Sequence, residues 1–278
     1  LSLKRRKLNN VSEIFTAGRW KFKVLKDQSN KICASVVRYN GYDTEVVIPK
    51  SIRINNVTLE VTSIGEGAFS HCILLESITI PNGVTYISDW TFSHCSSLKS
   101  ITIPNSVTHI GKTAFFGCFS LTSICIPNSI TYIGDGAFSR CTNLLYIKIP
   151  KSVSYIGDWV FKGCESLTHV ELPDGITSIK NTTFCGCCNL TSINIPSTIT
   201  HIGKNAFSDC SSLTSITIPN SVVYIGPRAF ENCPLTIYCE TSSYHFGWRD
   251  DWFDPNCKIN GKNRKNKELL DYCELKLK

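Results

Sequence analysis

A 23-residue period runs through most of this chain and constrains its fold more than any other feature. Eight phenylalanines and seven prolines recur at this step between Ile64 and Cys233, with no insertion or deletion. Eight cysteines share the step: Cys72, Cys95, Cys118, Cys141, Cys164, Cys187, Cys210 and Cys233. A strict period without loop variation predicts that each copy forms one coil of a solenoid.

One copy of the unit indicates which of its segments are extended. Residues 98–103 alternate between inward and outward positions, as a strand does. Pro104 ends this strand, because proline lacks the N–H that a central ladder needs. Residues 107–110 form a second short extended piece, and residues 113–116 are long enough for one helical or 3₁₀ turn. The Leu, Ile, Val, Ala, Phe and Cys positions point inward, where stacking buries them.

The segments that flank the repeat are predicted to be caps, because a solenoid must cover its terminal coils. Residues 20–24 and 33–37 alternate like strands, and residues 52–59 form a hairpin with Asn-Asn at its tip. Aromatic residues in 246–253 cover the last coil, although such a run also suits stacking on sugars or bases. We therefore divide the chain into a basic extension 1–12, a β cap 13–60, the solenoid 61–239, an aromatic cap 240–258, and a basic tail 259–278 that is mobile or forms a short helix.

The net charge of +7 lies mainly at the ends of the chain. Residues 1–60 hold 12 Lys and Arg against 5 Asp and Glu, whereas residues 61–240 hold 9 against 11. This distribution disfavours a nucleic-acid-binding face along the body, although the basic ends leave that partner as a minor alternative. No run of 18 apolar residues is present to span a membrane, and no signal peptide is visible in the opening residues.

The pattern L-x-x-I-x-I matches the start of a leucine-rich repeat. Here proline follows the strand directly, and the cysteine stands just before the leucine. These features resemble the 23-residue repeats of BspA-like leucine-rich repeat proteins, for which the phrase SIGEGAFSHCILLESITIPNGVTYI is typical. The resemblance covers residues 64–239 and implies a right-handed, β-rich solenoid with a ribbon of parallel strands. It also implies a cell-surface or secreted protein of a bacterium or protozoan that acts in adhesion or ligand binding and is not an enzyme.

The ladder cysteines suit burial as free thiols, because parallel Cβ vectors are poorly aimed for a disulfide. If a disulfide forms, the favoured pair is Cys239–Cys257 in the C-terminal cap, although pairing cannot be deduced from sequence. Cys185 and Cys188 form a C-x-x-C, but no second pair or thioredoxin-like context supports a zinc or redox site. Chance variation at these positions is the simpler interpretation.

Candidate ligand-binding residues are sought in the outward columns that vary from coil to coil. Most strand-face positions carry Ser or Thr, but the middle coils depart from this at Cys125, Leu145, Tyr146, Lys148, His169 and Glu171. Apolar or aromatic groups beside charges favour a protein-binding patch, and ordinary surface drift between copies explains them equally well. A second outward column carries Tyr86, His109, Tyr132, Tyr155, Ser178, His201 and Tyr224. It suits either a stabilising ring stack or carbohydrate binding, as do Trp90 and Trp159 nearby.

The sequence holds no catalytic, cofactor-binding or metal-binding motif. Gly-rich phosphate loops, H-E-x-x-H, G-x-S-x-G and EF-hand patterns are all missing from it. We therefore expect a non-enzymatic scaffold that needs no cofactor, metal or small-molecule substrate and binds a protein, or a glycan, on a cell surface or in the extracellular matrix. The alternative is a structural spacer within a larger surface protein, without a ligand of its own.

Overall fold

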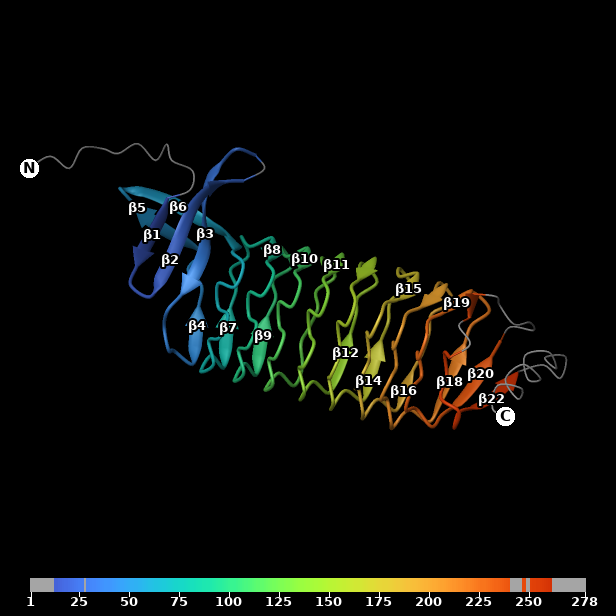
Figure 1. Cartoon of the computed structure of the whole chain (residues 1–278). Helices are drawn as coiled ribbons and strands as arrows, with labels where there is room; N and C mark the ends of the chain where they lie inside the picture. The colour runs from blue at the N-terminus through green and yellow to red at the C-terminus, as the bar shows by residue number, and fades with distance from the viewer. Residues whose placement is uncertain (1–12, 28, 241–246, 249–250, 262–278) are drawn as a thin grey trace, which may run out of the picture.

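The protein is one elongated stack of coils in the computed structural model, which describes residues 13–27, 29–240, 247–248 and 251–261 (Figure 1). Each repeat coil places extended segments on two sides of the stack, where successive segments form parallel ribbons. No helix occurs among the described residues. The predicted solenoid and its parallel strand ribbon are therefore confirmed.

The first ribbon is built from the segment that precedes each repeat proline (Figure 1). It contains strands β4 (Glu45–Val47), β7 (Ser77–Thr79), β9 (Ser100–Thr102), β12 (Tyr146–Lys148), β14 (His169–Glu171), β16 (Ser192–Ile193), β18 (Ser215–Ile218), β20 (Thr236–Cys239) and β22 (Lys258–Gly261). Within the regular repeat coils, as from β7 to β9 and from β12 to β16, the register matches residues one period apart, and Lys148 lies opposite Glu171.

The second ribbon is built from the segment that ends each copy in Ile before the turn. It contains β6 (Val57–Ile64), β8 (Tyr86–Ile87), β10 (His109–Ile110), β11 (Tyr132–Ile133), β13 (Tyr155–Ile156), β15 (Ser178–Ile179), β17 (His201–Ile202), β19 (Tyr224–Ile225) and β21 (Gly247–Trp248). The tyrosine and histidine column of the sequence lies on these strands, with one ring in each coil from β8 to β19 except at Ser178 of β15.

A column of stacked phenylalanine rings forms the centre of the core. The rings of Phe115 and Phe138 lie 5.3 Å apart at 3°, and the next pair in the column is 5.8 Å apart. The Leu, Val, Ala and Cys columns are also buried, as the inward pattern predicted. Because each coil buries its apolar face only against its neighbours, the stack is stable as a whole.

The ladder cysteines bond one coil to the next. The thiol of Cys141 donates to the carbonyl of Phe115 in the preceding coil at 3.2 Å, and Cys164 donates to Phe138 at 3.2 Å. Burial raises the pKa of the Cys164 thiol to about 12. Free, buried thiols are thus confirmed for most of the ladder, although Cys72 is only half-buried.

The segment predicted as a helical or 3₁₀ turn is instead a run of hydrogen-bonded turns. Two positions in each repeat coil adopt positive φ, as at Thr113 (47°) and Gly117 (70°). Alternate N–H groups then point out of the coil: Phe115 donates to the carbonyl of Ala137 in the following coil at 2.8 Å. That prediction was wrong because these groups bond between coils rather than within one helical turn.

Three hairpins form the N-terminal end, between β1 (Ile14–Ala17) and β2 (Trp20–Lys26), between β2 and β3 (Ile32–Tyr39), and between β5 (Ser51–Ile54) and β6. Strands β1, β2 and β3 are antiparallel, and β3 then pairs in parallel with β6. Strand β5 pairs with β6 through a turn at Asn55 and Asn56, both with positive φ. The strands and the Asn-Asn tip expected from the sequence are confirmed.

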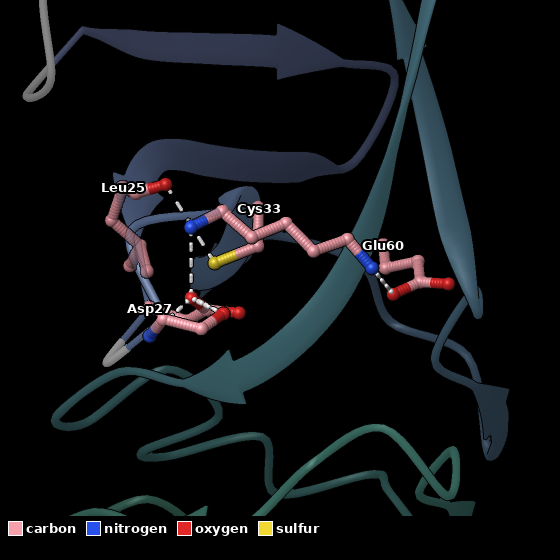
Figure 2. A network of polar contacts seen from close by, with 6 residues as sticks. Leu25, Asp27, Cys33 and Glu60 are labelled. Atoms are coloured by element: carbon pink, nitrogen blue, oxygen red, sulfur yellow. Dashed lines mark hydrogen bonds and ion pairs between the residues drawn. The ribbon is translucent and has the colours of Figure 1, made fainter.

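Polar contacts hold the hairpin between β2 and β3 (Figure 2). The Asp27 carboxylate accepts hydrogen bonds from the backbone N–H of Ser29 and of Lys31, both at 2.9 Å. The Lys31 ammonium then reaches Glu60 of β6 at 2.6 Å. The Cys33 thiol donates across the hairpin to the carbonyl of Leu25 at 3.6 Å. These contacts orient the hairpin against the first coils.

Two buried tryptophans cover the C-terminal coil. The Trp252 ring meets Phe230 edge-on at 5.8 Å, and Trp248 lies 5.2 Å from Trp252. The predicted aromatic lid is confirmed for these described residues. Strand β22 pairs with β20, so residues 259–261 belong to the stack and not to the predicted tail; residues 262–278 lie outside the described part. Cys257 is a free thiol, so the disulfide considered for Cys239–Cys257 was wrong.

Candidate functional site

The six candidate residues lie on neighbouring coils of the first ribbon. Leu145 is 52% exposed and Tyr146 is 40% exposed, and Cys125 is exposed on the preceding coil. The rings of Tyr146 and His169 stack in parallel, with centroids 5.9 Å apart. Register explains this arrangement, because residues 23 apart stand side by side on parallel strands.

Two contacts to the Glu171 carboxylate hold the centre of the candidate site together. The Tyr146 hydroxyl donates to Glu171 Oε1 at 2.5 Å, and the Lys148 ammonium contacts Glu171 Oε2 at 2.7 Å. The hydrogen bond from Lys148, followed by that from Tyr146, lowers the pKa of Glu171. Glu171 therefore stays ionised and holds both side chains in place.

A pocket of about 740 Å³ opens beside this cluster. Cys125, Tyr146, Lys148 and Glu171 line it, whereas Leu145 and His169 do not. Most of its wall is apolar and comes from three successive coils: Ile124, Ile126, Ile149, Pro150, Leu172 and Pro173. An apolar hollow with a few fixed polar groups at its rim is the usual form of a recognition site.

The pocket lies where the first ribbon is interrupted. No strand is assigned to the described residues 122–126, which make only isolated bridges from Ser123 to Tyr146 and from Thr102 to Cys125. The adjoining Pro127 is half-buried, whereas Pro104 of the preceding coil is buried. The isoleucines of the two coils are equally buried, so the added apolar exposure of the irregular coil is at Pro127.

Sequence reasoning missed the residues on the far side of the pocket. Asn128, Lys151 and Asp174 line that side and follow the repeat prolines of three successive coils. Other coils carry Asn or Ser at this position, so Lys151 and Asp174 depart from the pattern just as Lys148 and Glu171 do. The sequence does show this departure, in the column of residues that directly follow the repeat prolines.

The arrangement suits binding. Among the described residues, no group of three or more His, Cys, Asp and Glu side chains is placed to hold a metal ion. The thiol of Cys188, in the C-x-x-C segment, donates to the carbonyl of Gly186 at 3.5 Å. No helix in the described part of the chain is long and apolar enough to cross a membrane.

The second outward column forms a ring stack. Tyr132 and Tyr155 are stacked 4.8 Å apart at 3°, and His109 lies 5.7 Å from Tyr132. Faces that stack on each other are not free for a sugar, so the structural interpretation holds for these rings. Trp90 is 48% exposed, but the half-buried Trp159 ring packs over Gly136, where a Cβ would lie 2.2 Å from the ring.

Solved structures of bacterial proteins share this fold. A leucine-rich repeat protein from Bacteroides ovatus is 30% identical, with a TM-score of 0.73 over 89% of this chain and 67% of its own. A Treponema pallidum leucine-rich repeat protein is 30% identical, with a TM-score of 0.63 over 71% and 90%. A leucine-rich cell surface protein from Faecalibacterium prausnitzii is 28% identical, with a TM-score of 0.69 over 91% and 73%.

The repeat itself matches a described family. Residues 49–161 and 138–245 match the BspA type leucine-rich repeat region, in six copies. None of the curated proteins matches the chain. Because the family match extends over more than half of the sequence and coincides with the stacked coils, this chain belongs to the BspA-type leucine-rich repeat family.

Proposed function

We propose that this protein is a non-enzymatic binding scaffold at a cell surface or in secreted form. Its ligand is a protein on a host or neighbouring cell, and it docks on the first ribbon at the Cys125–Glu171 pocket. The observation that carries the proposal is the coincidence of the variable columns with a mostly apolar pocket of about 740 Å³. The cell-surface protein of Faecalibacterium prausnitzii supports the location.

The chemistry of the rim defines what the ligand must offer. Glu171 already pairs with Lys148, whereas Lys151 and Asp174 make no ion pair within the described residues. A protein segment with an apolar anchor and flanking charges of both signs matches this lining. Such an anchor in an apolar pocket, with polar contacts at the rim, is the arrangement typical of interface hot spots.

The test is a binding screen with paired variants. The full chain is screened against an array of purified extracellular-matrix and cell-surface proteins, and each hit is measured by surface plasmon resonance. The double variant Tyr146→Ala/Lys148→Ala should weaken a hit roughly tenfold or more, as removing interface anchors does. The matched control, Ser192→Ala/Asn194→Ala, changes the same two columns two coils further along and should bind as the native chain does.

Two outcomes contradict the proposal. Equal loss of binding in both double variants would place the contact elsewhere on the ribbon or reflect misfolding, which thermal melting distinguishes. A chain that binds nothing on the array, while bridging other domains of a longer protein, would instead support the spacer function.

A further inference from the structure

The second ribbon has a seam between β13 and β15. In most coils the residue after the ribbon isoleucine donates its N–H to the previous coil: Gly134 to Ile110 at 2.9 Å, and Gly157 to Ile133 at 2.9 Å. Within the described residues, Lys180 makes no such bond, and β13 and β15 do not pair. The backbone ladder between the two neighbouring coils is thus interrupted at Lys180, although the N–H of the adjacent Asn181 still donates to the Asp158 carboxylate at 2.9 Å.

A single side chain accounts for the seam. A Cβ on Gly134 would lie 2.7 Å from the backbone nitrogen of Lys112, and one on Gly203 would lie 2.6 Å from that of Asn181. Lys180 occupies the equivalent position with a Cβ, so its coil cannot approach the previous one as closely. Ser88, which also replaces the glycine, compensates by donating its hydroxyl to the carbonyl of Ile64 at 2.6 Å.

The ring stack lacks one member at the same place. Four rings, from Tyr86 to Tyr155, stack in succession, and His201 stacks on Tyr224 at 5.7 Å. Ser178 stands between these two groups and carries no ring. A gap of two coil spacings, roughly 10 Å, therefore separates Tyr155 from His201. One flat ring placed midway has neighbours at about 5 Å, within the range of aromatic pairs.

A notch with a cation at one side lies next to this gap, between the coils that carry Ser178 and His201. The notch is about 450 Å³ and is lined by residues 177–181, Thr200, His201 and Gly203. The half-buried Lys180 ammonium lies over the Tyr155 ring, 5.9 Å from its centroid. No ion pair of Lys180 exists among the described residues. A half-buried ammonium with only an aromatic face as partner attracts a carboxylate.

We propose that this notch binds an aromatic side chain of a partner protein that has an acidic residue next to it. The aromatic ring takes the missing place in the stack, between Tyr155 and His201, and displaces the Lys180 ammonium from the Tyr155 face. The neighbouring carboxylate pairs with Lys180. The notch is on the second ribbon, so it is independent of the pocket on the first.

The test uses short peptides and nuclear magnetic resonance on the full chain. Acetyl-Asp-Tyr-Asp-amide should shift the amide signals of residues 177–181 and 200–203. Replacing its tyrosine by leucine should weaken binding about fivefold, and replacing both aspartates by lysines should weaken it by a similar factor. Methyl glucoside serves as the sugar control.

Two variants keep the result interpretable. Ser178→Tyr installs the residue of the neighbouring coils, so it fills the gap, leaves the fold intact and should abolish the shifts. Lys180→Met keeps the side-chain length and should remove the difference between the acidic and basic peptides. Unchanged peptide binding by a folded Ser178→Tyr variant overturns the proposal. Binding of methyl glucoside but not of the tyrosine peptide also overturns it, in favour of a saccharide.

Discussion

Replacing Gly134 with alanine should open a second seam in the solenoid. The alanine Cβ would lie 2.7 Å from the backbone nitrogen of Lys112 and 2.8 Å from the carbonyl carbon of Gly111. These are backbone atoms of the preceding coil, which cannot rotate away as a side chain can. The coils must therefore separate, as they do at Lys180, where the equivalent position carries a Cβ.

The magnitude follows from the bonds that separation breaks. The Gly134 N–H donates to Ile110 at 2.9 Å, and the Thr131 N–H donates to Thr108 at 2.8 Å. Two such bonds contribute about 2 kcal/mol to the free energy of unfolding. Alanine also lowers the conformational entropy of the unfolded chain, which adds about 0.7 kcal/mol to the free energy of unfolding. The net loss is about 1.3 kcal/mol, or roughly 3–5 °C in Tm for a chain of this size.

Thermal melting followed by circular dichroism measures this loss, with Lys180→Ala as the matched control. The coils are already separated at Lys180, so its alanine variant should change stability by less than about 0.5 kcal/mol. Amide hydrogen exchange should also show faster exchange at Gly134 and Thr131 in the Gly134→Ala variant. A Gly134→Ala chain that is as stable as the native one, or more so, would refute the steric explanation, because backbone entropy alone predicts stabilisation.

Three further predictions concern the thiols, the lid and the pocket. Burial raises the pKa of Cys164 from 9.0 to about 12, so the unfolded chain loses this proton first. The contribution of this thiol to stability should be intact below pH 9 and fall by about 1.4 kcal/mol per pH unit between pH 9 and 12, as urea titrations at several pH values would show. Trp252→Ala should cost about 3 kcal/mol or more and make the last coils sensitive to limited proteolysis, whereas equal protease resistance would argue against the lid. Glu171→Ala should leave the melting temperature nearly unchanged, because its ion pair is exposed, yet release the Tyr146 hydroxyl, which tyrosine fluorescence or NMR would detect.

The periodic columns made the core and both caps predictable from sequence. Phe115, Cys141 and their equivalents, apart from the half-buried Cys72, are buried because a single inward position is copied along the stack. The turn at residues 113–116 was not predictable in the same way. Its residue types are compatible with a helical turn. Only the position of the neighbouring coil shows that alternate N–H groups donate hydrogen bonds to that coil. A property that depends on two coils at once cannot be obtained from the alternation within one.

The candidate site was predictable in part for the same reason. Tyr146, Lys148 and Glu171 depart from the Ser and Thr of their columns, and parallel register brings them together. The pocket beside them lies where residues 122–126 form no strand. The sequence does not predict this interruption, because Ser123 and Ile124 match the other copies. The site residues could therefore be named from sequence, whereas the hollow that they line could not.

Each ribbon has an interruption that coincides with a cavity, at Cys125 in the first and at Lys180 in the second, and this coincidence has a physical basis. A continuous ribbon satisfies its backbone groups between coils and covers the apolar faces of its strands, so it offers a partner little beyond Ser and Thr hydroxyls. Separation of coils at Lys180 and loss of the strand at Cys125 each give up inter-coil hydrogen bonds and expose a cavity lined by side chains. Each lost bond costs about 1 kcal/mol, which a long stack of otherwise regular coils can sustain. Cooperative stacking over many identical units is thus what allows individual coils to be irregular, and irregular coils are where this family member can be specific.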